Sequence, residues 1–192
     1  MENTKEIDKI KILGILSQIL YIFSSLGGLL VFVGFLMKIF LFYDSSKIFN
    51  NKKIFKNYIL SISMYFLGGL ILTLVFIFIL LKNPVILFSN PLYILEILWQ
   101  NPKLLILTIF SYIIFVIGAE FYRKTMLEFY KLTEIQRFKT AGDLTLLSII
   151  LLPIIVGAFI AIIQIVVESI AYIEINSQKL SEKLNQENLN QS

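Results

Sequence analysis

The chain has 192 residues, of which 57% are hydrophobic, and its mean hydropathy is +0.82. In soluble domains about half of the residues are apolar, so this composition argues against a soluble protein and predicts an integral membrane protein. Cysteine and histidine are both absent, which excludes disulfides, thiolate chemistry, the usual zinc and haem sites, and proton transfer by histidine.

The formal net charge of +4 raises the question of which anionic partner the chain meets. A basic protein can bind nucleic acid, but here Lys and Arg lie in short loops that flank apolar runs. This placement is typical of loops at the anionic inner surface of a membrane. We therefore expect the lipid bilayer as a partner, and no nucleic acid.

Two apolar runs, residues 12–43 and 144–175, are too long for simple spans. A helix of thirty-two residues, the length of each run, is about 48 Å long, whereas the hydrocarbon core of a bilayer is about 30 Å thick. Each run is therefore either one overhanging span or a tight helical hairpin. The first hairpin would turn near residues 24–28, and Pro153 and Gly157 would break the second.

The distribution of basic residues favours the hairpins. Two hairpins place four segments on one side of the membrane: residues 1–11, 44–57, 120–143 and the tail from Asn176. These segments carry 14 Lys and Arg residues, and the opposite side carries only Lys82 and Lys103, whereas two single spans would divide them 7 against 9. The positive-inside rule then predicts a multi-pass protein of the cell membrane with both termini in the cytoplasm. Six full spans, or two spans plus two re-entrant hairpins, give the same sidedness.

The predicted fold is all-α: a polytopic integral membrane protein of about six membrane helices. These include two short helical hairpins, and an outer interfacial helix and a cytoplasmic amphipathic helix extension complete the fold. In chain order the single membrane domain, residues 1–176, contains a hairpin at 12–43, a span at 58–81, an interfacial cap at 82–103, a span at 104–122 with an extension to 139, and a hairpin at 143–175. The tail at 177–192 has too few apolar residues to fold alone, so we expect it to be flexible.

The span at 58–81 carries no charge, and its Gly68–Gly69 pair permits a close helix contact. In the cap that follows, Ser89-Asn90-Pro91 predicts the start of a helix. Its apolar residues would share one face: Leu92, Leu95, Leu98 and Trp99. Tyr93 and Trp99 suit the level of the lipid headgroups. We expect an interfacial helix that bridges two spans; a binding lid is the alternative.

The extension to residue 139 is amphipathic. Three pairs of opposite charge stand at helical spacing: Glu120/Lys124, Glu128/Lys131 and Glu134/Arg137. An apolar strip accompanies them: Tyr122, Met126, Phe129 and Tyr130. We expect a solvated helix that lies along the membrane, with partner docking at 120–124 as the alternative. Gly142-Asp143 then predicts a stop and a restart, with Asp143 as the N-cap of the second hairpin.

Two stretches that lie 130 positions apart share a pattern of small and polar residues. Spacings of four, three and four place each set on one helix face: Gly157, Ala161, Gln164 and Glu168 in one stretch, and Gly27, Val31, Gly34 and Lys38 in the other. We interpret them as the inner packing faces of two hairpins that face each other.

Lys38, Gln164 and Glu168 are the candidate polar residues inside the membrane. Ionisable groups within a span are costly, so they are functional candidates by default. Lys38 has three interpretations: its ammonium snorkels toward the cytoplasmic end near Asp44, it forms a structural ion pair with Glu168 that specifies helix register, or it takes part in transport.

The sequence contains no motif of a known catalytic site. The phosphate-binding loop G-x-x-x-x-G-K-[ST], the dinucleotide fingerprint G-x-G-x-x-G and the nucleophile motif G-x-S-x-G are all absent. The serines lack histidine partners, and Glu96, Glu120 and Asp143 fall in different layers of the predicted fold. We therefore expect no catalytic residue, no metal, no cofactor and no enzymatic activity.

Glycine and turn motifs along most of the chain resemble those of a known family. The motifs are Leu13-Gly14 leading to Gly27-Gly28-Leu-Leu and Gly34, Ser-Lys-Ile-Phe-Asn-Asn at 46–51, Ile54-Phe55-Lys-Asn57, Arg137-Phe-Lys-Thr-Ala-Gly142, and Pro153-Ile-Ile-Val-Gly157. The chain is similar to small, mainly archaeal membrane proteins catalogued as domain of unknown function nine-nine-six. This resemblance implies a polytopic membrane protein, and it supplies no activity, ligand or catalytic residue.

The sequence thus predicts a non-enzymatic structural or accessory subunit. It would associate with itself or with other membrane protein subunits through small-residue helix faces. The alternative is a small transporter or channel with a path near Lys38, Gln164 and Glu168. A continuous water-accessible cavity that reaches Glu168 would favour transport, and a dry interior with an exposed apolar flank would favour a subunit.

Overall fold

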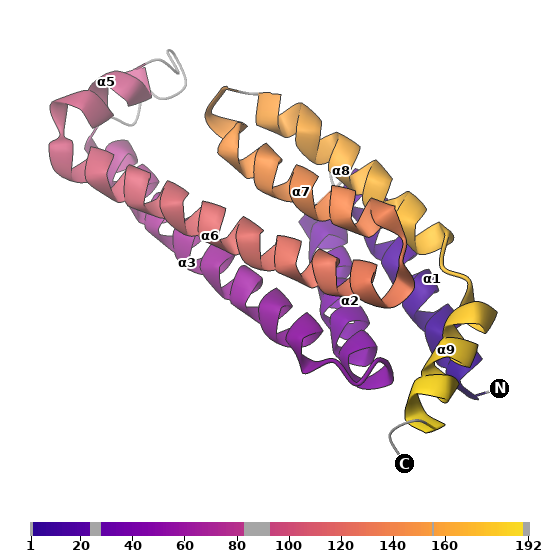
Figure 1. The fold of residues 1–192 in the computed structure, drawn as a ribbon. Helices are drawn as coiled ribbons and strands as arrows, with labels where there is room; N and C mark the ends of the chain where they lie inside the picture. Colours follow the sequence, from indigo (N-terminus) through magenta and orange to yellow (C-terminus); the bar gives the residue numbers. More distant parts are fainter. Residues whose placement is uncertain (1, 24–27, 83–92, 155, 190–192) are drawn as a thin grey trace. The chain divides into compact units, whose positions relative to one another are not determined.

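The computed structural model describes residues 2–23, 28–82, 93–154 and 156–189 (Figure 1). Within these ranges every element is helical: α1 (Glu2–Ile22), α2 (Gly28–Ile48), α3 (Lys52–Lys82), α5 (Tyr93–Gln100), α6 (Pro102–Thr133), α7 (Gln136–Ile150), the 3₁₀ turn η2 (Leu152–Ile154), α8 (Val156–Ile173) and α9 (Ser177–Leu189). The all-α class is therefore confirmed.

Four helices are long and apolar enough to cross a membrane: α2, α3, α6 and α8. The chain therefore has the helices of a membrane protein, as its composition predicts. Helix α7 has only 15 residues, and α1 begins with ten residues rich in charge. The predicted number of about six membrane helices remains a prediction.

The chain divides into two compact units. Unit 1 consists of Met1–Ile59 and Ala119–Ser192, and unit 2 consists of Leu60–Gly118. Helices α3 and α6 each contribute one part to unit 1 and another part to unit 2.

In unit 1, α1 and α2 pack against each other in antiparallel orientation. Lys9 Nζ lies 2.7 Å from Asp44 Oδ2 near one end of the pair. Farther along, a Cβ added to Gly34 would lie 3.3 Å from the carbonyl oxygen of Ser17 and 3.2 Å from Leu20 Cβ. The run at 12–43 is thus not one unbroken helix, and the predicted turn falls largely on residues 24–27, outside the described residues.

Both α1 and α2 extend beyond the apolar run at 12–43 into polar sequence, since α1 begins at Glu2 and α2 continues past Tyr43. Helix α2 ends only at Ile48, where Asn50 adopts a positive φ of 46°, a conformation that Asn tolerates better than most residues. The backbone N–H of Asn51 donates to the Ser46 carbonyl at 3.0 Å. The Asn51 side chain then accepts from Lys53 N at 3.1 Å, which caps the start of α3.

The prediction of a helix break at Gly142-Asp143 is wrong. Helix α7 runs through both residues, and the break lies at Glu134, whose φ is 60°. A Cβ at Gly142 would lie 3.0 Å from Met126 Cβ and 3.2 Å from the Arg123 backbone. The glycine therefore permits close packing of α7 on α6 and does not end a helix. Consequently α6 ends at Thr133 and not at 139.

The second apolar run is also divided. Helix α7 ends at Ile150, and Pro153 lies in the 3₁₀ turn before α8. Proline lacks the N–H that would continue the helix, so the predicted break at this residue agrees with the structure. Helices α7 and α8 pack side by side (Figure 1).

The tail forms a helix, in contrast to the predicted flexible segment. Helix α9 packs against α1 (Figure 1), and Leu180 and Leu184, one turn apart, are both buried. Asn176 caps the helix by accepting from Lys179 N at 3.1 Å. The low apolar content is sufficient because α9 folds onto an existing helix and does not need a core of its own.

In unit 2, parts of α3 and α6 pack together with α5. Val75, Ile79, Ile97, Leu98 and Leu104 form the buried apolar cluster. Of the predicted interfacial face on α5, Leu98 is buried in this cluster, whereas Leu95 and Trp99 are exposed, Trp99 by 81%. Residues 83–92, which include the predicted start at Ser89-Asn90-Pro91, and the side chain of Tyr93 lie outside the described residues.

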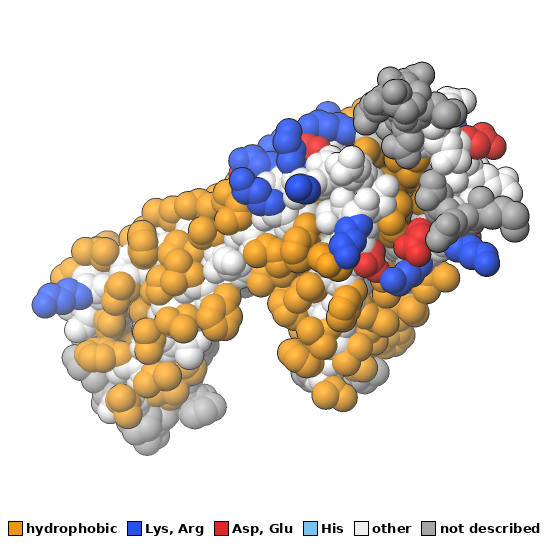
Figure 2. Space-filling model, turned by 90° about the horizontal axis from the view of Figure 1, so that it is seen from below, with side chains coloured by type: hydrophobic (Ala, Val, Ile, Leu, Met, Phe, Trp, Pro, Cys, Tyr) orange, Lys and Arg blue, Asp and Glu red, His pale blue; other side chains and the backbone are white. Residues whose placement is uncertain are grey.

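Figure 2 shows hydrophobic side chains over much of the visible surface, while most charged side chains gather in one region. Large exposed apolar residues occur on α2, α3, α6 and α8. In water such a surface would drive aggregation, but in a bilayer it faces lipid. The surface agrees with the composition.

Candidate functional site

Unit 1 contains a buried ion pair between Lys38 on α2 and Glu168 on α8. Lys38 Nζ lies 3.0 Å from Glu168 Oε1, and the two side chains are 8% and 0% exposed. Lys38 also donates to Tyr122 Oη at 2.6 Å. The Tyr122 hydroxyl lies 2.8 Å from both carboxylate oxygens of Glu168, to which it donates. Three helices therefore meet at one charged cluster.

Gln164 completes the cluster. Its side-chain amide donates to Glu168 Oε2 from one turn earlier on α8, a spacing at which helical side chains meet. The Glu168 carboxylate thus has donors from Lys38, Tyr122 and Gln164. All three of the polar candidates from the sequence lie together.

The direction of the Lys38 side chain differs from the snorkelling interpretation. Helical side chains point toward the N-terminus of their own helix, which for α2 is away from Asp44. In agreement, Lys38 Nζ lies 5.2 Å from the centre of the Tyr21 ring, while Asp44 pairs with Lys9. The ammonium is therefore directed into the helix bundle.

Tyr122 occupies the centre of the cluster, and sequence reasoning assigned it no role there. We placed it in the apolar strip of a solvated extension, but the strip faces the core of unit 1, where Met126 and Phe129 are fully buried. The available signal was its position at one end of an otherwise hydrophobic strip. A tyrosine there carries a hydroxyl that needs a partner when buried.

Aromatic rings surround the cluster on one side. The Phe42 ring lies 4.1 Å from Tyr58 and 6.2 Å from Tyr122, centre to centre. Phe129 continues the packing toward Tyr172 at 6.2 Å. These rings separate this side of the ion pair from bulk solvent, which strengthens its electrostatic attraction but makes each unpaired charge costly.

The matched small-residue faces do not pack as expected. Gly34 contacts α1 of its own hairpin, and a Cβ at Gly157 would overlap the Ser148 carbonyl oxygen and Leu152. Ala161 is only half-buried, Val31 is exposed, and Gly27 lies outside the described residues. Lys38 and Glu168, at the polar ends of the two faces, form an ion pair. Gly34 and Gly157 instead permit close packing against the neighbouring helix of their own hairpin.

The two adjacent glycines of α3 have different surroundings in unit 2. A Cβ at Gly68 would lie 3.3 Å from the Phe115 ring and from the Ser111 carbonyl oxygen, and Ser111 Oγ donates to the Gly68 carbonyl at 2.7 Å. By contrast, no atom of the described residues lies within 4 Å of a Cβ at Gly69. The predicted close contact therefore belongs to Gly68 alone.

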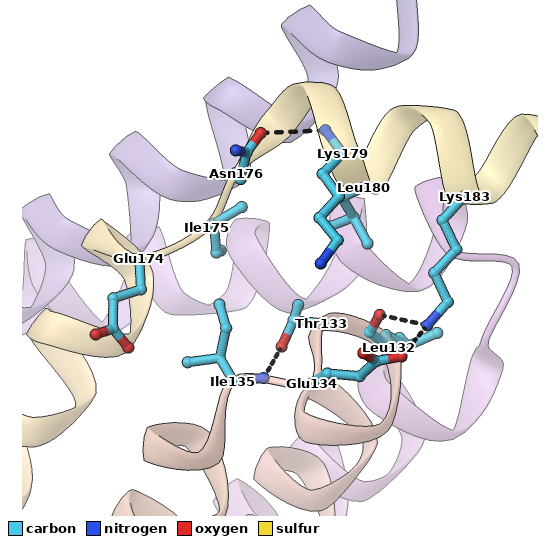
Figure 3. A pocket seen from close by; sticks show the side chains of 10 residues that line it. All are labelled: Leu132, Thr133, Glu134, Ile135, Glu174, Ile175, Asn176, Lys179, Leu180 and Lys183. Carbon is cyan, nitrogen blue, oxygen red and sulfur yellow. Dashed lines mark hydrogen bonds and ion pairs between the residues drawn. The ribbon is translucent and has the colours of Figure 1, made fainter.

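Unit 1 also has a cavity of about 350 Å³ at the linkers between α6 and α7 and between α8 and α9 (Figure 3). Lys183 donates to Glu134 Oε1 at 2.8 Å, and this hydrogen bond holds the pKa of Glu134 below its ordinary value of 4.5.

The predicted Glu134/Arg137 pair is wrong: Arg137 pairs with Glu174. The helix break at Glu134 separates the two residues. The Glu120/Lys124 and Glu128/Lys131 pairs are present, at 3.9 and 2.7 Å.

Comparison with known proteins identifies relatives without an assigned activity. The uncharacterized protein MJ1644 of Methanocaldococcus jannaschii is 29% identical over 179 residues, which cover 92% of this chain and 97% of that protein. No solved structure matches the chain. The model of the family described as Protein of unknown function (DUF996) matches residues 30–166, a range that includes Lys38, Tyr122 and Gln164. Since this match covers more than half of the chain, the protein belongs to the DUF996 family.

Proposed function

We propose that the protein is a non-enzymatic structural or accessory subunit of the cell membrane. The observation that carries this proposal is the closed arrangement of the Lys38–Tyr122–Glu168 cluster. The charges inside these apolar helices satisfy each other, and Glu168 is fully buried. Such a cluster specifies how α2, α6 and α8 pack.

The surface for association is the Gly69 face of α3, defined as Tyr65, Phe66, Gly69, Leu70, Thr73 and Leu74. These residues line a shallow cavity of about 440 Å³. Gly34, Gly68 and Gly157 are occupied by neighbours within the chain, but Gly69 is open. Small residues on a membrane helix permit the backbone of another helix to approach closely. A helix of a second copy or of another membrane protein fits this face.

Cysteine cross-linking in native membranes tests this role, because the natural chain has no cysteine. Thr73→Cys on the Gly69 face should give a cross-linked species of one fixed size with a short bifunctional maleimide. Gly69→Leu in the same chain should abolish it by filling the cavity. Leu67→Cys, exposed on the same helix but outside this face, is the control. Equal cross-linking at both cysteines would contradict a specific interface.

The proposed topology places both termini in the cytoplasm. It is supported by the charge distribution: Lys and Arg gather in the segments 1–11, 44–57, 120–143 and 177–192. A membrane-impermeant maleimide should leave Ser46→Cys and Ser177→Cys unlabelled in intact cells and label them after lysis. Labelling of either residue in intact cells would reverse the proposed orientation.

The alternative, a small transporter or channel with a path near Lys38, Gln164 and Glu168, rests on the same charged cluster, because ionisable groups inside membrane helices often mark ion pathways. Proteoliposomes loaded with a pH-sensitive or cation-sensitive dye separate the two roles. A flux that Glu168→Gln abolishes would support transport. A subunit predicts the same leak with the variant, the wild type and empty liposomes.

A further inference from the structure

Two polar groups in the core of unit 1 have no hydrogen-bond partner among the residues that the structure describes. Gln18 on α1 is fully buried, and neither its amide nitrogen nor its amide oxygen has a hydrogen-bond partner among the described residues. The hydroxyl of Tyr172 on α8, also fully buried, lies near the Glu168 carboxylate but meets no group of the described residues in hydrogen-bond geometry. Buried amides and hydroxyls without partners are rare in folded proteins, because they lose their hydrogen bonds to water without replacement.

The packing of α1 on α8 places Gln18 level with the ion pair. Helices α1 and α8 pack against each other, and Gly14 of α1 lies against the Tyr172 ring of α8. Just beyond the end of α8, Lys11 donates to the carbonyl oxygen of Ile175 and Asp8 accepts from Ser177, so the two chain segments run antiparallel. Progress along α1 from Asp8 through Lys11 to Gly14 thus corresponds to progress back along the chain from Ser177 through Ile175 to Tyr172. Gln18, one turn beyond Gly14, therefore lies at the level of Glu168, one turn before Tyr172.

The next turn of α1 supports this placement. Tyr21 follows Gln18 by three residues, so both lie on one side of the helix, and the Tyr21 ring is 5.2 Å from Lys38 Nζ. Gln18 thus lies on α1 between Gly14, which contacts Tyr172, and Tyr21, which faces Lys38. Its amide belongs to the same polar region as the charged cluster.

The charges and hydrogen-bonding groups around Gln18 and Tyr172 indicate which small species supplies their missing hydrogen bonds. Lys38 and Glu168 already neutralise each other at 3.0 Å, so the region has no unbalanced charge that selects a cation or an anion. The Gln18 amide needs both an acceptor and a donor, and the Tyr172 hydroxyl offers both functions. Water is neutral and supplies both, and buried waters with two to four polar partners are a regular part of folded proteins.

We propose that Gln18, Tyr172 and Glu168 form an internal water-binding site on the Lys38–Tyr122–Glu168 cluster. The water joins α1 to the three helices that already meet there. It provides partners for the Gln18 amide and the Tyr172 hydroxyl, and it donates to the carboxylate. One enclosed water is not a continuous water path to Glu168, so this site is compatible with the proposed subunit role and does not depend on it.

The sign of a stability change tests the proposal. Gln18→Met and Tyr172→Phe each remove a group that binds the water, so each should lower Tm in detergent by roughly 2–6 °C. Because both groups bind the same water, the double variant should lose less than the sum of the two single losses. If the amide and hydroxyl were unsatisfied in the native protein, each substitution would raise Tm. A rise in Tm, or additive losses, would overturn the proposal.

Nuclear magnetic resonance of the wild-type protein tests the water site without relying on the stability of a variant. In protein labelled with ¹⁵N-glutamine and placed in lipid nanodiscs, the Gln18 side-chain amide should show a cross peak to water. Comparison with Gln18→Met identifies the signal among the other glutamines. The exposed Gln100 is a positive control for contact with solvent. Absence of the Gln18 cross peak while that of Gln100 is present would refute the site, including the case in which Gln18 bonds directly to protein groups.

Discussion

The two units have interiors of opposite character. Unit 1 buries an ion pair, a bridging tyrosine and several aromatic rings. The described core of unit 2 is an apolar cluster, with a close contact at Gly68 between α3 and α6. Both units consist of helices that expose apolar side chains, so burial of apolar area cannot distinguish one helix arrangement from another in a bilayer.

This difference shows two ways to specify helix packing in lipid. In unit 1 specific polar partners select the arrangement, because any other leaves a charge unpaired in an apolar interior. In unit 2 the fit between the helix surfaces selects the arrangement, since Gly68 packs closely against Phe115 and Ser111. Substitutions of each kind should therefore affect the units differently.

The largest effect is expected from removing one charge of unit 1. Lys38→Met leaves Glu168 buried without its counter-ion, which should cost about 3–5 kcal/mol of stability. Lys38→Met with Glu168→Leu removes both charges and should restore most of this loss. Thermal unfolding in detergent measures both. Lys47→Met, on the same helix but outside the cluster, is the control, and equal losses in the single and double variants would show that the pair does not act as a unit.

A smaller effect is expected from removing the bridging hydroxyl. Tyr122→Phe keeps the ring but takes one donor from Glu168 and one acceptor from Lys38, at a cost of about 1.5–3 kcal/mol. Tyr130→Phe on the same helix is the matched control, because Tyr130 is half-buried and lies outside the charged cluster. Chemical denaturation in mixed micelles measures the difference. No difference between the two variants would show that the hydroxyl contributes nothing.

The stability of unit 2 should depend on side-chain size at the helix contact and not on charge. Gly68→Leu inserts a side chain against Phe115 and Ser111, and overpacking of this kind costs about 1–3 kcal/mol. Gly69→Leu, one residue away, points into open space and should leave the Tm of the detergent-solubilised monomer unchanged or slightly higher. A similar loss of Tm in both variants would mean that the α3–α6 contact does not depend on shape.

The smallest effect concerns the exposed pair at the edge of unit 1. The hydrogen bond from Lys183 holds the pKa of Glu134 below 4.5 in the folded protein. A lowered pKa means that the pair stabilises the protein at neutral pH and that this contribution is lost as pH falls through the folded-state pKa. The difference in Tm between wild type and Glu134→Gln should therefore shrink between pH 7 and pH 3. A constant difference would show that the charge of Glu134 is not responsible.

Much of the fold was predictable because hydrophobic runs and their breaks are local signals. The helical class, the apolar spans and the break at Pro153 follow from composition and from the missing N–H of proline. The errors at Gly142 and in the tail have a common origin. Gly142 permits a helix contact, and α9 is ordered by docking on α1, so both depend on neighbours that lie far away in the sequence.

The cluster itself was only partly predictable. The matched spacing brought Lys38, Gln164 and Glu168 to attention, since ionisable groups in apolar runs are rare. Tyr122 and Gln18 gave no comparable signal, because their importance depends on burial beside those charges.

The amino-acid sequence by itself determined that the chain is helical with segments apolar and long enough to cross a membrane, because hydropathy and helix length act through local chemistry. Only the tertiary structure decided which helices share the buried charges. Pairing between α2, α6 and α8 depends on the directions in which side chains leave their helices, and these directions acquire meaning only when the helices are packed.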